Sequence, residues 1–377
     1  MPSPAPLPSA HPSPAPRPTT LLLGADGFLG RWLALDLLRG GHPVAAGLRG
    51  GGARDTALRT WLTAHGADTT ALTTVDADVS RPGLGLSAAD EDLLGEVRDV
   101  VNLAARYAFG LSRAEARAAN LDGAVHPLRW ASGRPALRRV VHLSGYRVGR
   151  SAGLRHPLPP SDADRLYREL GAYEASKTEG DIAVRTLAPE LGVPLTVVNP
   201  GAVIGHSRTG EAGQYLGLAT LVEQLWTGRL PALAGSRRTV VPVVAVDHLA
   251  AFLAAAPVHD TAAVQVHTVL DPATPPLPEL VAIAARRLGV RAPRLLLPVG
   301  LVRRLPRALT GVEPETLSFL SEDVYDTESA ELLAAAAGLA HPPVERLVGD
   351  WAARLVADRF PGAAPAGRPE SASVAGQ

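Results

Sequence analysis

The chain has 377 residues, 46% of them hydrophobic, and its 37 basic and 37 acidic residues give a formal net charge of zero. This composition suits a globular protein with a sizeable core, and the balanced charge excludes the basic footprint of a nucleic-acid or membrane-surface binder. The absence of cysteine excludes disulfides, thiolate metal sites and a cysteine nucleophile.

The two ends of the chain share one composition. Residues 1–19 are rich in Pro, Ala and Ser and lack a basic stretch followed by an apolar one, so we expect a disordered leader and not a secretory signal. Residues 361–377 are predicted to be a disordered tail. The most apolar long window, 240–258, is interrupted by prolines and polar residues and predicts no membrane span. We expect a soluble, cytoplasmic protein.

From residue 20 to residue 200, short apolar runs alternate with segments of helical length. The runs typical of strands cover residues 20–23, 44–48, 72–75, 100–103, 140–143 and 195–198. Between the first two, apolar residues recur along one side of a predicted helix at 28–38. Strands that alternate with helices predict an α/β fold, here a Rossmann-type doubly wound parallel sheet.

After residue 200 the alternation gives way to loops rich in Gly and Pro. Helices are predicted at 215–227, 278–288, 298–305 and 329–337, while a strand and a helix within 240–255 are expected to return to the main sheet. The expected organisation is therefore a Rossmann domain of residues 20–200 and 240–258, with a small C-terminal substrate-binding lid region of residues 201–239 and 259–360.

The first chemical motif is the glycine-rich stretch LLLGADGFLG. Gly24, Gly27 and Gly30 follow an apolar strand and open an amphipathic helix. In a dinucleotide-binding turn, such glycines allow a tight turn, close approach to a pyrophosphate and packing of the helix on the strand. The pyrophosphate would lie at the helix N-terminus, beside Phe28 and Leu29. An ordinary Gly-rich turn is the alternative interpretation.

Arginine stands where an NAD-binding unit would present an acid. The second predicted strand ends in Leu48 and Arg49, and Arg49 with Arg54 can meet a ribose 2′-phosphate, which favours NADP over NAD. Solvated loop arginines are the alternative. Asp78 follows the third strand, where it can reach the adenine or simply cap a turn.

Seven segments carry a family resemblance: GADGFLG (24–30), DADVSRPGLGLS (76–87), NLAA (102–105), NLDG (120–123), HLSGYRVG (142–149), YEASK (173–177) and VVNPGAVIG (197–205). Together they resemble an extended short-chain dehydrogenase/reductase, most like the branch with thioester-reductase and fatty-acyl-reductase domains. The resemblance covers residues 20–260. It implies further cofactor contacts at Val79, Asn102, Ala104, Ala105, Tyr173, Lys177, Pro200, Gly201 and Val203.

Three residues depart from the family pattern. Asp26 stands where the family usually has threonine, beside the expected pyrophosphate. Asn102 and Asn199 stand at strand ends where relatives often carry His and Arg. We expect both asparagines to face the cofactor and to alter the nicotinamide end of the site.

Lys177 is the only lysine in the chain, and it follows Tyr173 by four residues. A lysine placed at random would fall four residues after one of the six tyrosines about 2% of the time. The two side chains share a helix face. A carbonyl reductase needs a general acid near neutral pH, and an ammonium beside a phenol favours the phenolate. Lysine can also exchange protons and reach the nicotinamide ribose, whereas arginine stays charged.

Ser144 and Asn120 complete the predicted catalytic set. Ser144 ends the fifth strand, where its hydroxyl can hydrogen-bond a substrate carbonyl oxygen; a turn serine is the alternative. The family's catalytic Ser or Thr stands five residues before a glycine, as Ser144 does before Gly149. Asn120 matches the family's helix asparagine, which supports a water relay to the lysine; a polar surface residue is the alternative.

The remaining signals are weaker. The eleven histidines show no HExxH or HxH spacing, so no metal site is predicted. Tyr146 can lie near the substrate or pack in the interior. Five arginines surround an apolar stretch of the lid and can receive an acyl carrier protein or form a solvated face: Arg291, Arg294, Arg303, Arg304 and Arg307.

These features predict an NADP(H)-dependent reductase of an aldehyde, a ketone or an acyl thioester. Tyr173 would act as the acid/base group, Lys177 would tune it, Ser144 would position the oxygen and Asn120 would complete the relay. An epimerase or dehydratase that retains NAD is one alternative, and a non-catalytic NADP-binding sensor or scaffold is another. The sequence does not predict the substrate, the reaction direction or the oligomeric state.

Overall fold

The computed structural model describes residues 16–105, 111–148, 153–215, 217–304, 317 and 319–360. The predicted leader lies outside this set except for its last four residues, 16–19, and the predicted tail lies wholly outside it.

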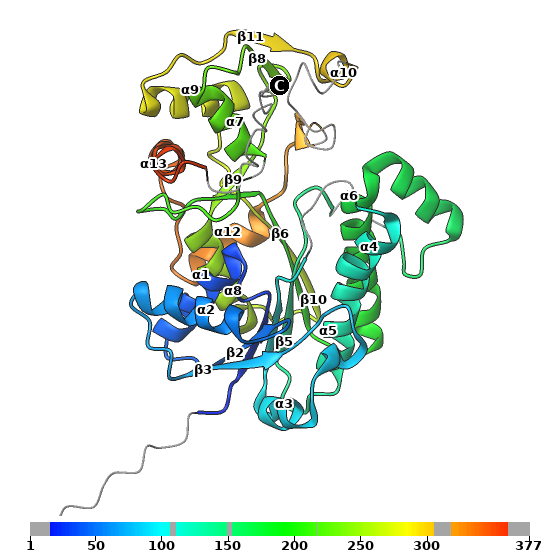
Figure 1. The fold of residues 1–377 in the computed structure, drawn as a ribbon. Helices are drawn as coiled ribbons and strands as arrows, with labels where there is room; N and C mark the ends of the chain where they lie inside the picture. Colours follow the sequence, from blue (N-terminus) through cyan, green and yellow to red (C-terminus); the bar gives the residue numbers. More distant parts are fainter. Residues whose placement is uncertain are drawn as a thin grey trace, which may run out of the picture.

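A seven-stranded parallel sheet organises the larger lobe of the molecule (Figure 1). Its spatial order is β10 (Val264–Val269), β6 (Leu195–Pro200), β5 (Arg139–Leu143), β4 (Asp99–Asn102), β1 (Thr20–Leu23), β2 (Val44–Leu48) and β3 (Leu72–Asp76). The chain runs outward from β1 to β3 and then returns to the other side of β1, so the order reverses between β1 and β4. Parallel sheets bind ligands outside the carboxyl ends of the strands at such a reversal. The predicted doubly wound sheet and its first six strands are confirmed.

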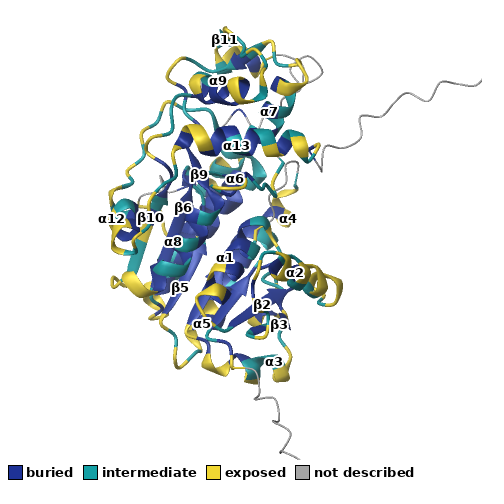
Figure 2. Cartoon of the chain, turned by 90° about the vertical axis from the view of Figure 1, so that its left-hand side faces the viewer, coloured by how far each residue is buried: buried dark blue, intermediate teal, exposed yellow. Residues whose placement is uncertain are grey.

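Helices cover both faces of this sheet, which explains why its strands are nearly continuous apolar runs (Figure 2). Leu22, Ala46 and Val101 face one helical layer. This layer contains α1 (Phe28–Arg39), α2 (Ala53–Ala64), α8 (Val246–His259) and α12 (Glu328–Ala336).

Leu21, Leu23 and Val140 face the opposite layer. Its main helices are α5 (Gly123–Ser132) and α6 (Pro160–Glu190). The shorter elements that precede them in the chain are η1 (Pro82–Gly85), α3 (Ala88–Leu93), η2 (Leu94–Glu96), α4 (Arg113–Arg117) and the π-helical turn η3 (Ala118–Asp122).

A second lobe lies above the carboxyl ends of the strands in Figure 1. Its elements are β7 (Ala202–Ile204), α7 (Leu218–Trp226), β8 (Ala232–Ala234), β9 (Val243–Ala245), α9 (Leu277–Leu288), β11 (Leu295–Leu297), α10 (Val299–Val302) and α13 (Val344–Ala357). The strands pair as β7 with β9 and β8 with β11.

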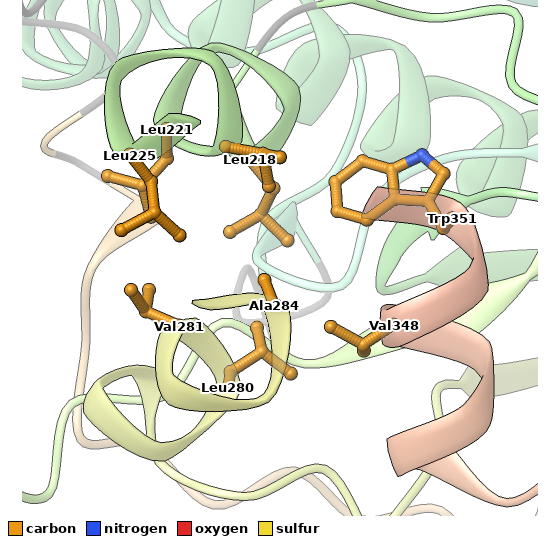
Figure 3. A pocket seen from close by; sticks show the side chains of 9 residues that line it. Leu218, Leu221, Leu225, Leu280, Val281, Ala284, Val348 and Trp351 are labelled. Carbon is orange, nitrogen blue, oxygen red and sulfur yellow. The ribbon is translucent and has the colours of Figure 1, made fainter. Parts of the chain in front are cut away.

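The second lobe has its own hydrophobic core. Apolar side chains of α7, α9 and α13, among them Leu225, Leu280 and Trp351, face one another across a void of about 20 Å³ (Figure 3). The lining is apolar and the void is no larger than a water molecule needs, so it is a packing gap and not a ligand pocket.

The region after residue 200 differs from the sequence prediction in two respects. The predicted strand within 240–255 does not return to the main sheet, because β9 pairs with β7. Residues 264–269, which the sequence placed in the lid region, form the edge strand β10 beside β6. Only one neighbour pairs with β10, so three of its six residues are half-buried and one is exposed. It therefore lacks the continuous apolar run that marks a central strand.

Candidate active site

The glycine-rich turn between β1 and α1 fits a dinucleotide pyrophosphate. Gly24 has a φ of +82°, and a Cβ there would lie 3.0 Å from the Ala104 nitrogen. A Cβ on Gly30 would lie 2.0 Å from the Gly24 oxygen, so only glycine lets α1 pack against the turn. Gly27 caps α1 without a side-chain hydrogen bond, which leaves the first-turn N–H groups, including those of Phe28 and Leu29, free of a side-chain cap. An anion can bind there.

Arg54 forms an ion pair with Asp26, an acidic residue of this turn. Its guanidinium donates to Asp26 at 3.1 Å, and about half of the Arg54 side chain is exposed. Asp26 would otherwise place an unpaired negative charge beside a pyrophosphate. In the structure Arg54 therefore offsets the charge of Asp26.

Arg49 lies in an open loop at the end of β2. It is exposed and makes no hydrogen bond or ion pair with another residue of the described ranges. The next three residues, Gly50–Gly52, all have positive φ, and a Cβ on any of them would meet nothing within 4 Å. The Gly50 N–H donates to Asp76 at 2.8 Å. The loop thus presents an exposed guanidinium next to three glycines that have open space around them.

Asp78 makes a turn after β3. Its Oδ1 accepts hydrogen bonds from the Ser80 N–H at 2.9 Å and from the Ser80 hydroxyl at 2.6 Å. Burial opposes ionisation, but these bonds and the charges of Arg49 and Arg81 lower the pKa of Asp78. This is the capping role that the sequence left open beside adenine contact. Val79 lies against Gly123 at the start of α5.

Asn102 is directed into the protein at the end of β4. Its side chain is 1% exposed; Nδ2 donates to the Gly123 carbonyl at 2.8 Å, and Oδ1 accepts from the Ala104 N–H at 3.2 Å. Its amide therefore joins β4 to α5 instead of facing the cofactor as expected. Ala104 and Ala105 follow β4 directly, and Ala104 lies opposite Gly24.

The α6 helix breaks just before the predicted acid/base residue. Gly171 has φ +77° and ψ +170°, so α6 consists of two helical segments, and Tyr173 lies in the first turn of the second. Tyr173 is half-buried. Lys177 follows one turn later with 7% of its surface exposed, and its Nζ donates to the Leu143 carbonyl at 2.9 Å. Burial lowers the pKa of Lys177 to about 8, an effect that the charge of Asp181 opposes.

Ser144 lies immediately after β5, next to the carbonyl that accepts from Lys177. Its N–H donates to the Val198 carbonyl at 2.8 Å, which fixes the residue against β6. The hydroxyl is buried and makes no hydrogen bond of ordinary geometry within the described ranges, but it lies close enough to Asp181 to lower the carboxyl pKa. Gly149 lies outside the described residues.

Asn120 links η3 to the catalytic segment of α6. Its Nδ2 donates to the Ser176 hydroxyl at 2.9 Å, and that hydroxyl donates to the Tyr173 carbonyl at 2.9 Å. A Cβ on Gly180 would lie 2.6 Å from the backbone carbonyl oxygen of Asn120. The close approach of η3 to α6 therefore requires glycine at residue 180. Asn120 and Ser144 thus flank the segment of α6 that carries Tyr173 and Lys177.

The loop after β6 borders this site. The Gly201 N–H donates to the Val269 carbonyl at 2.9 Å, and a Cβ on Gly201 would lie 2.7 Å from the Pro242 oxygen. Pro200 accepts from the Tyr146 N–H at 3.3 Å, and Val203 lies in β7. The Asn199 Oδ1 is buried and has no hydrogen-bond partner among the described residues, so it can still serve a ligand.

Tyr146 lies at the boundary between the lobes. Its side chain is 7% exposed, its hydroxyl donates to the Phe319 carbonyl at 3.4 Å, and its ring meets that of Tyr325 edge-on at 5.1 Å. Of the five lid arginines, the described four are exposed on the second lobe around β11 and α10, and Arg307 lies outside the described residues.

Asp181 is the site neighbour that sequence reasoning missed. It is fully buried one turn after Lys177, and Arg185 forms an ion pair with it at 2.5 Å. The spacing of four residues from Lys177 was the available signal.

The described ranges contain neither a metal-binding cluster nor a membrane-spanning helix. They hold no group of three or more His, Cys, Asp or Glu side chains that could bind a metal ion. No helix in them is long and apolar enough to cross a membrane.

Residues 22–253 match the model of the family described as male sterility protein. The chain is also 27% identical over 207 residues to the NRPS-like oxidoreductase fscA of Fusarium equiseti, a match that covers 52% of this chain and 19% of that protein. The chain spans about a fifth of the length of the curated relatives it matches.

Solved structures share the fold. The terminal R domain from the myxalamid PKS-NRPS biosynthetic pathway matches with a TM-score of 0.73 and 22% identity over 91% of both chains. A UDP-galactose 4-epimerase matches with a TM-score of 0.58 and 17% identity over 90% of this chain and 99% of that one. At such identities the likeness shows the architecture alone.

Proposed function

The chain belongs to the male sterility protein family, within the thioester-reductase branch of the extended short-chain dehydrogenase/reductases, and on that premise we propose that it is an NADP(H)-dependent reductase of an aldehyde, a ketone or an acyl thioester. The nicotinamide would supply the hydride. The protein would bind it, orient the acceptor and provide the proton.

The observation that carries this proposal is the grouping of four side chains near the carboxyl ends of the strands. Lys177 is bonded to the end of β5, Ser144 is the next residue of that segment, and Asn120 braces the helix turn that holds Tyr173. A binding module has no need of a buried lysine one turn from a tyrosine. A reductase uses such a pair to protonate the oxygen that hydride transfer leaves negatively charged.

Each residue then has one task. The Tyr173 hydroxyl gives its proton to the substrate oxygen, and the Lys177 ammonium stabilises the phenolate that remains. The Ser144 hydroxyl, which has no partner of ordinary geometry in the described structure, donates to the same oxygen and holds it in place. Asn120 keeps η3 against α6 and would hold a water molecule through which solvent returns the proton toward Lys177.

Acyl thioester reduction needs no cysteine in this scheme. Hydride adds directly to the thioester carbon, the oxygen takes the proton from Tyr173, and the product of this step is a hemithioacetal. Loss of the thiol from that carbon then yields an aldehyde. The absence of cysteine in the chain is compatible with this route and with simple carbonyl reduction.

The same proposal includes an acyl carrier protein as a source of substrate. The structural neighbour with the TM-score of 0.73 is a terminal R domain of a PKS-NRPS pathway. Arg291, Arg294, Arg303 and Arg304 are exposed on the second lobe, where they can receive an acidic surface.

Tyr173→Phe tests the catalytic assignment. We expect NADPH binding, measured by calorimetry, to be retained while NADPH oxidation with aldehyde and acyl-thioester substrates is abolished. Near-normal turnover in this variant would refute the assignment. NAD retained by the purified protein would instead favour an epimerase or dehydratase. NADPH binding without turnover of a broad carbonyl panel by the unaltered chain would favour a sensor or scaffold.

Arg49→Ala tests the cofactor preference. A guanidinium that meets a phosphate contributes well over 1 kcal/mol, so we expect KM for NADPH to rise about tenfold or more while KM for NADH stays unchanged. Arg54→Ala is the matched comparison: since Arg54 neutralises Asp26 in the glycine-rich turn, its loss should weaken both cofactors alike. Equal effects of Arg49→Ala on both cofactors would contradict the NADP preference.

A further inference from the structure

A row of polar side chains extends from the proposed reaction centre along α6. Tyr173, Lys177, Asp181 and Arg185 recur every fourth residue, so they lie along one side of the helix. The charge alternates along the last three. Lys177 is 7% exposed and Asp181 is fully buried, whereas a quarter of the Arg185 side chain reaches solvent. The row therefore connects the buried site to the surface.

Asp181 has one ion-pair partner and two further polar groups that act on its charge. Arg185 forms an ion pair with its Oδ2 at 2.5 Å, and Lys177 acts on it from the preceding turn. The Ser144 hydroxyl approaches from the segment after β5. The carboxylate thus lies one helical turn from the proposed tuning residue, on the same side of α6.

The charges around Lys177 make Asp181 its counterion. Burial strongly disfavours an ammonium, and Asp181 opposes that effect. Burial and the charge of Lys177 lower the pKa of His142 on β5 to about 3, so this ring is neutral near pH 7 and adds no charge beside the lysine. On the α4 and η3 side of α6, Arg117 pairs with Glu179, which is also bonded by Tyr167.

Burial of the Asp181 carboxylate costs folding free energy. Burial raises the pKa of Asp181, and Arg185, the Ser144 hydroxyl and Lys177 act in the opposite direction. An apolar residue would avoid that cost at this position. The carboxylate is accounted for if the neighbouring lysine must stay charged.

We propose that Asp181 is a positioning residue of the active site, which keeps Lys177 protonated. This inference rests on the proposed reductase function for its catalytic meaning. The effect of Asp181 on the protonation of Lys177 can be measured without any substrate.

The single lysine of the chain makes that measurement direct. Protein labelled with ¹³C-lysine gives one Cε resonance, whose titration reports the protonation of Lys177. In Asp181→Asn, which keeps the shape and removes the charge, we expect the titration midpoint to fall by about half a pH unit or more. Glu179→Gln is the matched control, because Glu179 is an equally buried carboxylate on α6 that pairs with Arg117. It should leave the midpoint unchanged.

A second variant guards against misfolding. If Asp181→Asn does not fold because Arg185 loses its partner, the double variant Asp181→Asn/Arg185→Gln removes both charges of the pair. Its midpoint should still fall, because Asp181 is one helical turn nearer to Lys177 than Arg185 is. Asp181→Glu should restore the midpoint of the unaltered chain.

The pH dependence of kcat tests whether the charge of Asp181 affects catalysis. Loss of a negative charge makes both Lys177 and Tyr173 release protons at lower pH, so the alkaline limb of kcat should move to lower pH in Asp181→Asn. A merely structural role would lower kcat equally at every pH. The proposal is overturned if the titration midpoint of Lys177 is unchanged in Asp181→Asn, as it should be in Glu179→Gln. A shifted midpoint in a chain without reductase activity would instead mean that the proposed function is wrong.

Discussion

Lys177 combines a functional charge with an unfavourable location. Its pKa is lowered to about 8 from the usual 10.5, so the unfolded chain binds this proton more tightly than the folded chain does. The free energy of unfolding therefore rises as pH increases from 8 to 10.5, where the folded lysine becomes neutral first. Below pH 8 the buried ammonium lowers stability.

A prediction about stability follows from the sign of this pH dependence. Lys177→Met should abolish turnover and raise the free energy of unfolding near pH 7 by about 1–3 kcal/mol. The gain should shrink as pH rises above 8, and urea unfolding near neutral pH and near pH 10 measures it. Lys177→Arg keeps the charge and should give no gain. An equal gain at both pH values would show that packing, and not the charge, is responsible.

The sequence singles out Tyr173 and Lys177 because a lone lysine at a spacing of four is visible without a fold, and their catalytic roles stay a prediction. The partners of side chains were less accessible. Asn102 was expected to face the cofactor, yet its amide bonds to Gly123 and Ala104, and that arrangement depends on how α5 packs against β4. Asp181 was overlooked because a buried carboxylate and an exposed one look alike in a sequence. Hydrogen bonds between distant segments become visible only when the elements are placed.

At the scale of elements, the break in α6 sets the position of Tyr173. With φ +77° and ψ +170°, Gly171 occupies a backbone region essentially restricted to glycine. The second segment starts afresh after it, and the positive end of the helix dipole falls in the first turn, where Tyr173 stands. The break therefore favours negative charge on the proposed acid/base residue.

Gly171→Ala should strain this break. We expect a loss of about 1–3 kcal/mol in the free energy of unfolding, together with a drop in kcat, because the strain can be relieved only by moving the turn that holds Tyr173. Gly300→Ala in α10 is the control, since a Cβ there meets nothing within 4 Å and the glycine has no positive φ. Chemical denaturation and steady-state kinetics provide the two readouts. Unchanged kcat in a destabilised variant would separate the break from catalysis.

The elements of the main sheet were predictable because helices bury them on both faces. Strands such as β1 and β2 are buried throughout, and their mostly apolar residues stand out between helical segments. The same reasoning failed for β9 and β10. Three residues of β9 pair only with β7, and β10 is a half-exposed edge strand, so neither shows the pattern of a central strand.

At the scale of the whole molecule, the larger lobe has a hydrophobic core on each face of its sheet, and the second lobe has a core of its own. The core of the second lobe contains Leu280 beside the small void among α7, α9 and α13. Leu280→Ala should cost about 2–5 kcal/mol in the free energy of unfolding because it removes buried methyl groups and enlarges that void. Leu332→Ala, at a site 66% exposed, should change it by less than about 0.5 kcal/mol. NADPH affinity should stay constant in both, and a Leu280→Ala cost as small as that of Leu332→Ala would contradict this description of the core.

The edge strand β10 also bears on where the chain can be divided. The family match ends at residue 253, before β10, yet β10 covers the full length of β6 on the side away from β5. A fragment ending at 258 would leave the backbone N–H and C=O groups on that side of the buried β6 unpaired. Such an edge is a template for pairing between copies. The edge strand β10 thus protects the Rossmann lobe from self-association, so a fragment cut where the family match ends should associate more readily than the full chain.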